Sequence, residues 1–352
     1  MQSISRRGLV VSAAAASAAF GLNGPLEFVA PASAQKGSGP GGSPAASPAP
    51  KAGAAPVHAN GSRQALIDKG FSKFKVGNAE VTMLYDGTWE KAHDPGFIKN
   101  ASVDETKAAL KAANMTDAYM PIPFTVPVVR IGGKTIMFDS GTGGQASPTA
   151  GLIQQKGMLK AAGIDPASIS TIIVTHFHPD HIFGLMAKDT NEQIFPNAEI
   201  IVPTAEYKFW TDPGTIAKLP EARQGLAKRI QATMPTWKNI KQVDDGKDAV
   251  PGIKAIASYG HTPGHTAYVL GSGAQQLIIS SDVTNVAALF AKNPDWMAAF
   301  DADGAMAVAS RKAIFDRAIA DKAIVTGYHW GLPGAGTIKK DGNGYALVPV
   351  AV

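Results

Sequence analysis

Cysteine is absent from the 352-residue sequence. This excludes a disulfide-stapled scaffold and any metal site built on thiolates. Long hydrophobic runs are also missing, because the apolar stretch near the N-terminus is too short to cross a bilayer of roughly 30 Å as a helix. Charged residues make up 17%, and the lysines and arginines are scattered singly, without the aromatic-interleaved basic stripe of a nucleic-acid-binding surface. We therefore expect no nucleic-acid partner.

The first 34 residues are typical of an export signal. Arg6 and Arg7 precede a short Ala/Val/Leu run, and an A-x-A cleavage signature ends at Ala34. The twin arginines favour the twin-arginine route, so we expect a periplasmic or secreted protein. No cysteine is available for a lipid anchor, and we expect no stable membrane anchor after cleavage.

The remainder divides into a linker and one folded domain. Residues 35–61 are rich in Pro, Ala, Gly and Ser, which predicts a disordered linker before a domain spanning 62–352. Short β-branched runs alternate with helical patterns in this domain, which predicts an α/β layered fold. The expected strands lie at 80–86, 126–131, 135–139, 171–175, 199–203, 253–259, 266–271, 276–280 and 323–327.

Three segments carry helical signals. Ser102 and Glu105 form a capping box that opens a helix, and residues 304–320 have apolar side chains at helical spacing. Residues 205–245 have helical character, several aromatic side chains and no strand pattern. We interpret this last segment as a helical insertion lying over an active site.

Three of the eight histidines crowd into THFHPDH, residues 175–181, directly after the apolar run TIIV. In an extended segment, residues two apart point the same way, so His176 and His178 can bind one ion. Asp180 and His181 follow a proline turn and can reach a second ion. The N and O donors suit two divalent ions, zinc by default, with manganese, iron or cobalt as alternatives.

Further candidate ligands follow other predicted strands or enter them. One arrangement gives the first metal His176, His178 and His265, gives the second metal Asp180, His181 and His329, and makes Asp282 a bridge between the two. His261, four residues before His265, is interpreted either as a residue that supports the ligands or as a structural hydrogen-bonding residue of the turn.

The motif H-x-H-x-D-H after a buried strand resembles the signature of the metallo-β-lactamase superfamily, and the later TPGHT, S-D and GYH elements match its ligand positions in order. The resemblance covers roughly residues 79–349. It implies an αβ/βα four-layer sandwich with two metals at one edge, to which the predicted helical insertion is added. It also implies that Asp139, in FDSG, supports the metal-binding loops.

Within this superfamily, residues 250–270, 195–198 and 344–350 are similar to methyl parathion hydrolases, and quorum-quenching lactonases share the metal pattern. Two departures stand out. Residues 180–184 read DHIFG where D-H-x-G-G is usual, and TGGQAS follows DSG where methyl parathion hydrolases carry a pocket aromatic. Trp210 matches a pocket position, while Phe183 and Trp330 are weighed as pocket residues or core residues.

The resemblance implies a dinuclear hydrolase in which a metal-activated hydroxide attacks a lactone or ester, with phosphotriesters as a further substrate class. Asp180 and Asp282 are the expected catalytic carboxylates. The expected partner is a small-molecule substrate, and relatives of this kind often form homodimers. The alternatives are a periplasmic β-lactamase, a glyoxalase II-like thioesterase, an RNA nuclease, and a non-catalytic metal-binding or sensor protein.

Overall fold

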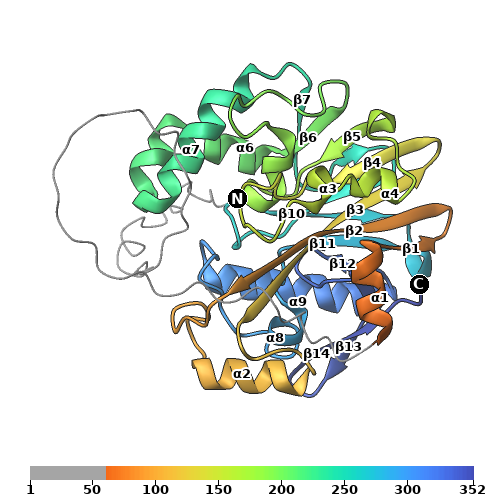
Figure 1. Ribbon diagram of the computed structural model, residues 1–352, viewed down its shortest axis with the longest axis vertical. Helices are drawn as coiled ribbons and strands as arrows, with labels where there is room; N and C mark the ends of the chain where they lie inside the picture. The colour runs from red at the N-terminus through yellow and green to blue at the C-terminus, as the bar shows by residue number, and fades with distance from the viewer. Residues whose placement is uncertain (1–60) are drawn as a thin grey trace, which may run out of the picture.

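The computed structural model describes residues 61–352, and the predicted export signal and nearly all of the predicted linker lie outside this range. Two seven-stranded sheets lie at the centre, with α6 and α7 on one outer side and α9 on the other (Figure 1). This arrangement confirms the predicted αβ/βα sandwich. No helix within residues 61–352 is long and apolar enough to cross a bilayer.

The first sheet follows chain order from β1 to β7. Its strands are β1 (Phe71–Val76), β2 (Ala79–Lys91), β3 (Met120–Ile131), β4 (Lys134–Phe138), β5 (Ile169–Ile173), β6 (Glu199–Pro203) and β7 (Ile240–Val243). The strands from β1 to β4 pair antiparallel, and those from β4 to β7 pair parallel. The carboxyl ends of β4, β5 and β6 therefore meet at one edge.

The second sheet has the order β14-β13-β12-β11-β10-β9-β8. Its strands are β8 (Asp248–Val250), β9 (Ile253–Ala257), β10 (Thr266–Leu270), β11 (Leu277–Ser281), β12 (Ile324–Gly327), β13 (Ala335–Asp341) and β14 (Gly344–Pro349). Its one parallel pair joins β11 to β12, so the carboxyl ends of these two strands also lie side by side.

Nine helices lie around the two sheets in the described part of the chain (Figure 1). They are α1 (Gly61–Lys69), α2 (Val103–Ala112), α3 (Leu152–Gln155), α4 (Met158–Ala161), α5 (Pro179–Ile182), α6 (Thr204–Thr211), α7 (Glu221–Thr233), α8 (Ala287–Phe290) and α9 (Gly304–Asp321). Short 3-10 turns lie at Pro166–Ser168, Phe183–Leu185, Pro213–Lys218, Met234–Thr236 and Gly273–Gln275. The predicted capping box is confirmed, since Ser102 and Glu105 hydrogen-bond reciprocally at the start of α2.

Alternation along each strand builds a three-part core. In β5 and the residue after it, Ile173 packs between the two sheets while Ile172 and Val174 pack toward the helices. Both faces of the strand are buried, which explains why it appears in the sequence as a continuous apolar run. Tyr268 from β10 lies in the inter-sheet core, and its hydroxyl donates to the Val174 carbonyl at 2.9 Å, which ties the second sheet to the first.

The outer strands of both sheets were not predicted from the sequence. The segment 205–245 contains α6 and α7 as expected, but its end forms β7, so the prediction that it holds no strand is wrong. β7, an edge strand of the first sheet, carries an exposed lysine side chain, and so does β13, which pairs with the edge strand β14 of the second sheet. A strand at a sheet edge is only half covered and lacks the apolar run of a central strand.

Arg311 of α9 is a buried cation that fixes the segment after β11. Only 1% of its surface is exposed, and its guanidinium donates to the carbonyls of Val283, Pro294 and Trp296 at 3.0, 2.6 and 2.9 Å. These carbonyls lie in the stretch that follows Asp282. One side chain therefore satisfies three backbone acceptors of the segment 283–296.

We predict that Arg311→Met lowers the free energy of unfolding by about 3 kcal/mol, because it leaves buried carbonyls without donors. Urea denaturation followed by circular dichroism measures this loss. Arg317→Met, which removes an exposed ion pair with Asp321 on the same helix, is the matched control and costs about 0.5 kcal/mol or less. Equal losses in the two variants would contradict the role given to Arg311.

Candidate metal centre

Five loops from the two sheets converge at one edge of the sandwich. Asp139 follows β4, and the THFHPDH segment follows β5. On the other sheet, the GHTPGH turn precedes β10, Asp282 follows β11, and His329 lies just past β12. The two halves are joined by a hydrogen bond between the hydroxyls of Thr175 and Ser281, 2.9 Å apart.

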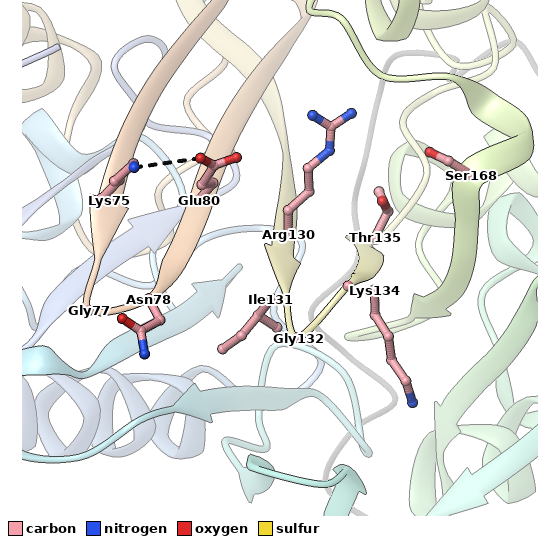
Figure 2. A pocket seen from close by; sticks show the side chains of 11 residues that line it. Lys75, Gly77, Asn78, Glu80, Arg130, Ile131, Gly132, Lys134, Thr135 and Ser168 are labelled. Atoms are coloured by element: carbon pink, nitrogen blue, oxygen red, sulfur yellow. Dashed lines mark ion pairs between the residues drawn. The ribbon is translucent and has the colours of Figure 1, made fainter.

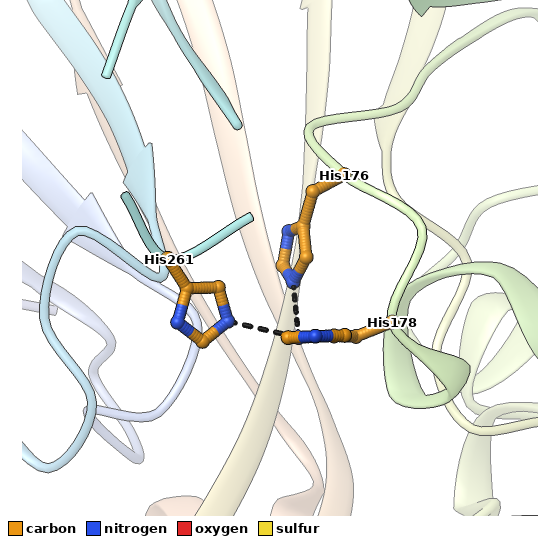
Figure 3. Close-up of side chains that lie close together, drawn as sticks. All are labelled: His176, His178 and His261. Carbon is orange, nitrogen blue, oxygen red and sulfur yellow. Dashed lines mark hydrogen bonds between the residues drawn. The ribbon is translucent and has the colours of Figure 1, made fainter. Parts of the chain in front are cut away.

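The first group of candidate ligands consists of His176, His178 and His261 (Figure 3). The Nδ1 atom of His178 lies 3.1 Å from Nε2 of His176 and 2.9 Å from Nε2 of His261. On its other side, His261 Nδ1 lies 2.9 Å from a carboxylate oxygen of Asp301 and carries the proton of that bond. One proton on His178 Nδ1 cannot satisfy both facing nitrogens, whereas a cation among the three rings satisfies all of them.

The second group consists of Asp180, His181, Asp282 and His329, whose donor atoms lie within 4.8 Å of one another. His181 Nε2 lies 3.3 Å from Oδ2 of Asp180 and 3.3 Å from Oδ1 of Asp282. His329 Nε2 lies 2.9 Å from Oδ2 of Asp282. This set of two carboxylates and two imidazoles suits zinc and similar divalent ions.

Asp282 lies between the two groups. Besides its contacts in the second group, its Oδ2 atom lies 3.2 Å from Nε2 of His261 in the first. The structure thus places the Asp282 carboxylate between the two groups, so both could share it. His181 Nε2 and Asp282 Oδ1 are fully buried and have no hydrogen-bond partner among the described residues. Such atoms are costly unless a ligand meets them, so the residues fit a pair of bound cations.

The assignment of His265 to the first metal is wrong in the structure, and His261 takes its place. His265 is buried, its Nδ1 lies 2.8 Å from the Ser258 hydroxyl and 3.1 Å from the Ser258 carbonyl, and its Nε2 accepts from the Asp282 backbone N–H at 3.2 Å. Both ring nitrogens are therefore engaged. Burial, with the nearby His261, lowers the pKa of His265 to about 3, which keeps the ring neutral as this arrangement requires.

Most of the ligand histidines are oriented through their second nitrogen. Asp139 accepts from His181 Nδ1 at 2.8 Å and from the Thr175 backbone N–H at 2.8 Å, which is the supporting position that the resemblance implies. His329 Nδ1 lies 2.9 Å from the Pro123 carbonyl. Partners of this kind fix the tautomer and the ring plane of a ligand, so the donor nitrogens are aimed before any metal arrives.

Electrostatics favour a cation in the first group. Burial lowers the pKa of His176 and His178 well below the usual value, so both rings are neutral at pH 7 and present lone pairs. For His261, burial also lowers the pKa, but the carboxylates of Asp282 and Asp301 outweigh it and raise the pKa to about 9. A proton on His261 therefore stands where a metal would bind, and metal binding would release it.

An apolar cavity opens beside both groups. Its walls are largely aromatic and aliphatic, with the candidate ligands on one side. The lining residues are Trp89, Ile122, Phe124, Ala146, His178, Pro179, Asp180, Ala222, Arg223, Leu226, His261, Asp282, Asn285, Phe300 and His329. Residues 222, 223 and 226 belong to α7, so the predicted insertion does lie over the site. An apolar pocket with a few convergent polar groups is the usual form of a small-molecule site.

The three aromatic residues predicted for the pocket lie elsewhere. Trp210 is buried, and its indole N–H donates to Glu206 at 2.7 Å. Phe183 packs in the core with the Arg229 guanidinium 4.4 Å above its ring. Trp330 packs in the core under α9 and donates to the Thr284 hydroxyl at 3.2 Å. The pocket assignment of Trp210 is therefore corrected, and for Phe183 and Trp330 the core alternative holds; short motifs do not reveal these packing contacts.

Trp89, Phe124 and Phe300 form the aromatic wall instead. Trp89 lies on a part of β2 beyond the predicted end of that strand at residue 86. Phe300 lies in a segment before α9 without helical or strand periodicity, and its ring is 6.3 Å from that of Trp89. The alternation along an extended β2 could have identified Trp89, whereas nothing in the sequence marks Phe300.

A second hollow, of about 620 Å³, lies at the turns of the β1–β2 and β3–β4 hairpins (Figure 2). Lys75, Glu80, Arg130 and Lys134 border it, and Lys75 pairs with Glu80 across the strands at 3.6 Å. It contains none of the candidate metal ligands. The chemistry is therefore assigned to the cavity beside the histidines.

Comparison with known proteins identifies the family. The model of the metallo-β-lactamase superfamily matches residues 125–314, which is more than half of the chain. The chain belongs to this superfamily. The matched region holds every residue of the two ligand groups except His329.

Two curated relatives are N-acyl homoserine lactonases. The chain is 27% identical over 169 residues to one from Bacillus sp, an alignment that covers 48% of the chain and 58% of the relative. It is 30% identical over 120 residues to the lactonase AttM of Azorhizobium caulinodans, covering 32% of the chain and 40% of the relative. The matches thus span roughly half of the relatives' length.

Two solved structures overlap over most of the chain. One is AidC, a dizinc quorum-quenching lactonase in complex with its product, with a TM-score of 0.70, 28% identity, and coverage of 80% of this chain and 98% of that one. The other is the hydrolase AbOPH in the β-lactamase superfamily, with a TM-score of 0.74, 27% identity and the same coverage. The described fold therefore matches these two chains over nearly their whole length.

We predict that His261→Ala and His265→Ala differ in zinc content. His261→Ala removes a nitrogen that faces the cation position, so the purified variant should bind one ion fewer per chain than the wild type. His265→Ala removes a ring that bonds only to Ser258 and to the Asp282 backbone, so it should retain both ions with reduced stability. Mass spectrometry of metal content after dialysis measures the difference, and the reverse pattern would restore the original assignment of His265.

Proposed function

We propose that the chain is a two-metal hydrolase that opens the ring of N-acyl homoserine lactones. The observation that carries this proposal is the pair of ligand groups joined by Asp282 at the side of an apolar cavity. The lactonase relatives and the likeness to AidC support the substrate class. We propose zinc as the native metal, since the donors are imidazole and carboxylate and AidC is described as a dizinc enzyme.

The first metal would be held by His176, His178 and His261 and the second by Asp180, His181 and His329, with Asp282 shared. Two bound ions lower the pKa of a water and polarise a substrate carbonyl. The chain supplies the orientation of these ligands and the apolar cavity. Asp180 also offers a proton relay: it lines the cavity, and 18% of its side chain is exposed.

Asp180 can accept a proton only if its side chain is present as the ionised carboxylate. Burial raises its pKa, but His181 and His329 outweigh this and bring the pKa below its ordinary value. Asp180 is thus an acceptor at neutral pH. We propose that it takes a proton from the attacking water and returns it to the ring oxygen as the lactone opens.

The cavity wall suits a substrate with a long apolar substituent. Trp89, Phe124 and Phe300 offer aromatic surface for an acyl chain, and Leu226 extends this wall from α7. Arg223 and Asn285 are polar groups of the same lining, suited to an amide. The aromatic wall also favours aryl phosphotriesters as a second substrate class, because it replaces the aromatic residue missing after the DSG motif.

We further propose that the protein is exported through residues 1–34 and acts in the periplasm or outside the cell as a homodimer. Export is supported by the twin arginines and the A-x-A signature in the sequence. Dimerisation is what the resemblance to the superfamily implies. Fractionation of the native host and light scattering of the mature chain test these two points.

We predict that the zinc-loaded protein hydrolyses N-hexanoyl-homoserine lactone with a kcat/KM at least tenfold above that for methyl parathion, an aryl ester or a cephalosporin. A tenfold preference corresponds to about 1.4 kcal/mol of transition-state binding. His178→Ala should abolish turnover of all four, because it removes a candidate ligand. Preference for methyl parathion would favour the phosphotriester alternative, and preference for the cephalosporin would reject the lactonase proposal.

We predict that Phe300→Ala lowers kcat/KM for N-decanoyl-homoserine lactone about tenfold while changing N-butanoyl-homoserine lactone much less. The longer chain needs the aromatic wall, and losing that contact removes about 1–2 kcal/mol of apolar burial. Phe209→Ala, which removes a phenyl group outside the cavity lining, is the matched control and should leave the ratio unchanged. Equal losses for both chain lengths would show that Phe300 acts on the metal site instead.

A further inference from the structure

Glu206 of α6 is a fully buried carboxylate near the first ligand group. None of its surface is exposed, and its two oxygens accept four hydrogen bonds. It belongs to neither group of candidate ligands. Burying a carboxylate costs free energy unless its oxygens are hydrogen-bonded, and the four donors around Glu206 meet this requirement.

One oxygen of Glu206 holds the loop after β5. Its Oε1 accepts from the backbone N–H of Phe177 at 2.9 Å and from the Trp210 indole at 2.7 Å. Phe177 stands between His176 and His178. The bond therefore fixes the backbone from which both of these histidines project.

The other oxygen holds the turn before β10. Its Oε2 accepts from the Thr262 hydroxyl at 2.8 Å and from the Gly264 backbone N–H at 2.9 Å. Thr262 directly follows His261. A Cβ on Gly264 would lie 2.0 Å from the Glu206 backbone nitrogen, so only glycine allows the turn to approach α6 this closely.

We propose that Glu206 is a positioning residue for the first metal: it clamps the loop of His176 and His178 to the turn of His261. The three rings of the first group come from two segments that belong to different sheets, and Glu206 bonds to both segments at once. Bonds from N–H and O–H donors to an ionised carboxylate are stronger than neutral ones, so this clamp is rigid. It therefore sets the spacing of the three imidazole nitrogens without touching the ion.

The proposal predicts a selective loss of metal affinity in Glu206→Gln. Glutamine keeps the size of the side chain, but its amide has one acceptor oxygen and one NH₂ group, so it can accept from only one of the two segments. The first zinc site should weaken about 10- to 100-fold, as is typical when a group behind a ligand is lost. The second site, whose ligands do not contact Glu206, should keep its affinity. Competition with a chromophoric zinc chelator resolves the two dissociation constants without an activity assay.

Two control variants separate positioning from general stability. Trp210→Phe removes the indole donor but leaves the bonds to Phe177, Thr262 and Gly264, so both zinc sites should keep their affinity. Asp86→Asn disturbs another buried carboxylate, which bonds to Thr142 and Ile153 away from the first group, and should lower the unfolding midpoint without weakening the first site.

Thr262→Val provides a second route should Glu206→Gln fail to fold. It removes one of the two donors that come from the turn of His261, whereas Trp210→Phe removes a donor that lies on α6 itself and in neither clamped segment. A weakened first site in this folded variant would support the clamp, as would altered visible absorption of the cobalt-substituted protein. Wild-type affinity at both sites in Glu206→Gln, or in Thr262→Val where the former does not fold, would overturn the proposal. So would an equal weakening of both sites.

This inference rests on the two-metal site of the proposed function and not on its substrate. A wild-type protein that binds two ions but hydrolyses none of the four test substrates would reject the lactonase proposal and leave the clamp to be decided by the zinc affinities. A wild-type protein without a first zinc site would reject both.

Discussion

The metal centre depends on the registration of the two sheets. The THFHPDH segment of the first sheet supplies two members of each ligand group, and loops of the second sheet supply the rest, so neither sheet completes a group alone. The apolar core between the sheets brings them together, but apolar burial is non-directional. Directional bonds set the register: the Thr175 and Ser281 hydroxyls meet at 2.9 Å, and the Thr266 N–H donates to the Thr175 carbonyl at 3.1 Å.

The same registration explains why polar groups can be concentrated so deeply in the protein. Ionised carboxylates and imidazoles are expensive to bury unless each is paired. Here Asp139, Asp301 and the Pro123 carbonyl bind the outward nitrogens of three ligand histidines, and the inward nitrogens face one another or Asp282. The outward-facing nitrogens of these histidines therefore have hydrogen-bond partners. The unpartnered atoms, His181 Nε2 and Asp282 Oδ1, face the middle of the centre, where a cation would offset their negative potential.

The fold and most of the candidate metal ligands could be predicted from the sequence because the relevant signals are local. Nine strands of β-branched residues, and the spacing within THFHPDH, could be recognised without tertiary information. The choice between His261 and His265 could not, since both lie in one glycine-rich turn and only the contacts of Ser258 and Asp301 separate them. The cavity wall could not be predicted either. The rings of Phe300 and Trp89 are in contact although the two residues are more than two hundred positions apart in the sequence, and no short motif encodes that contact.

The segment from Ala298 to Asp301 contributes both to the cavity wall and to the orientation of a candidate metal ligand. Phe300 forms part of the cavity wall, and the next residue, Asp301, holds the ring of His261 while also accepting from the Ala298 backbone N–H at 3.0 Å. The surface that meets a substrate chain and the carboxylate that orients a metal ligand are thus covalent neighbours within one tight turn. Substitutions that reshape this wall for new substrates, by evolution or by design, will change metal retention along with substrate selectivity. The two properties are therefore coupled through this turn.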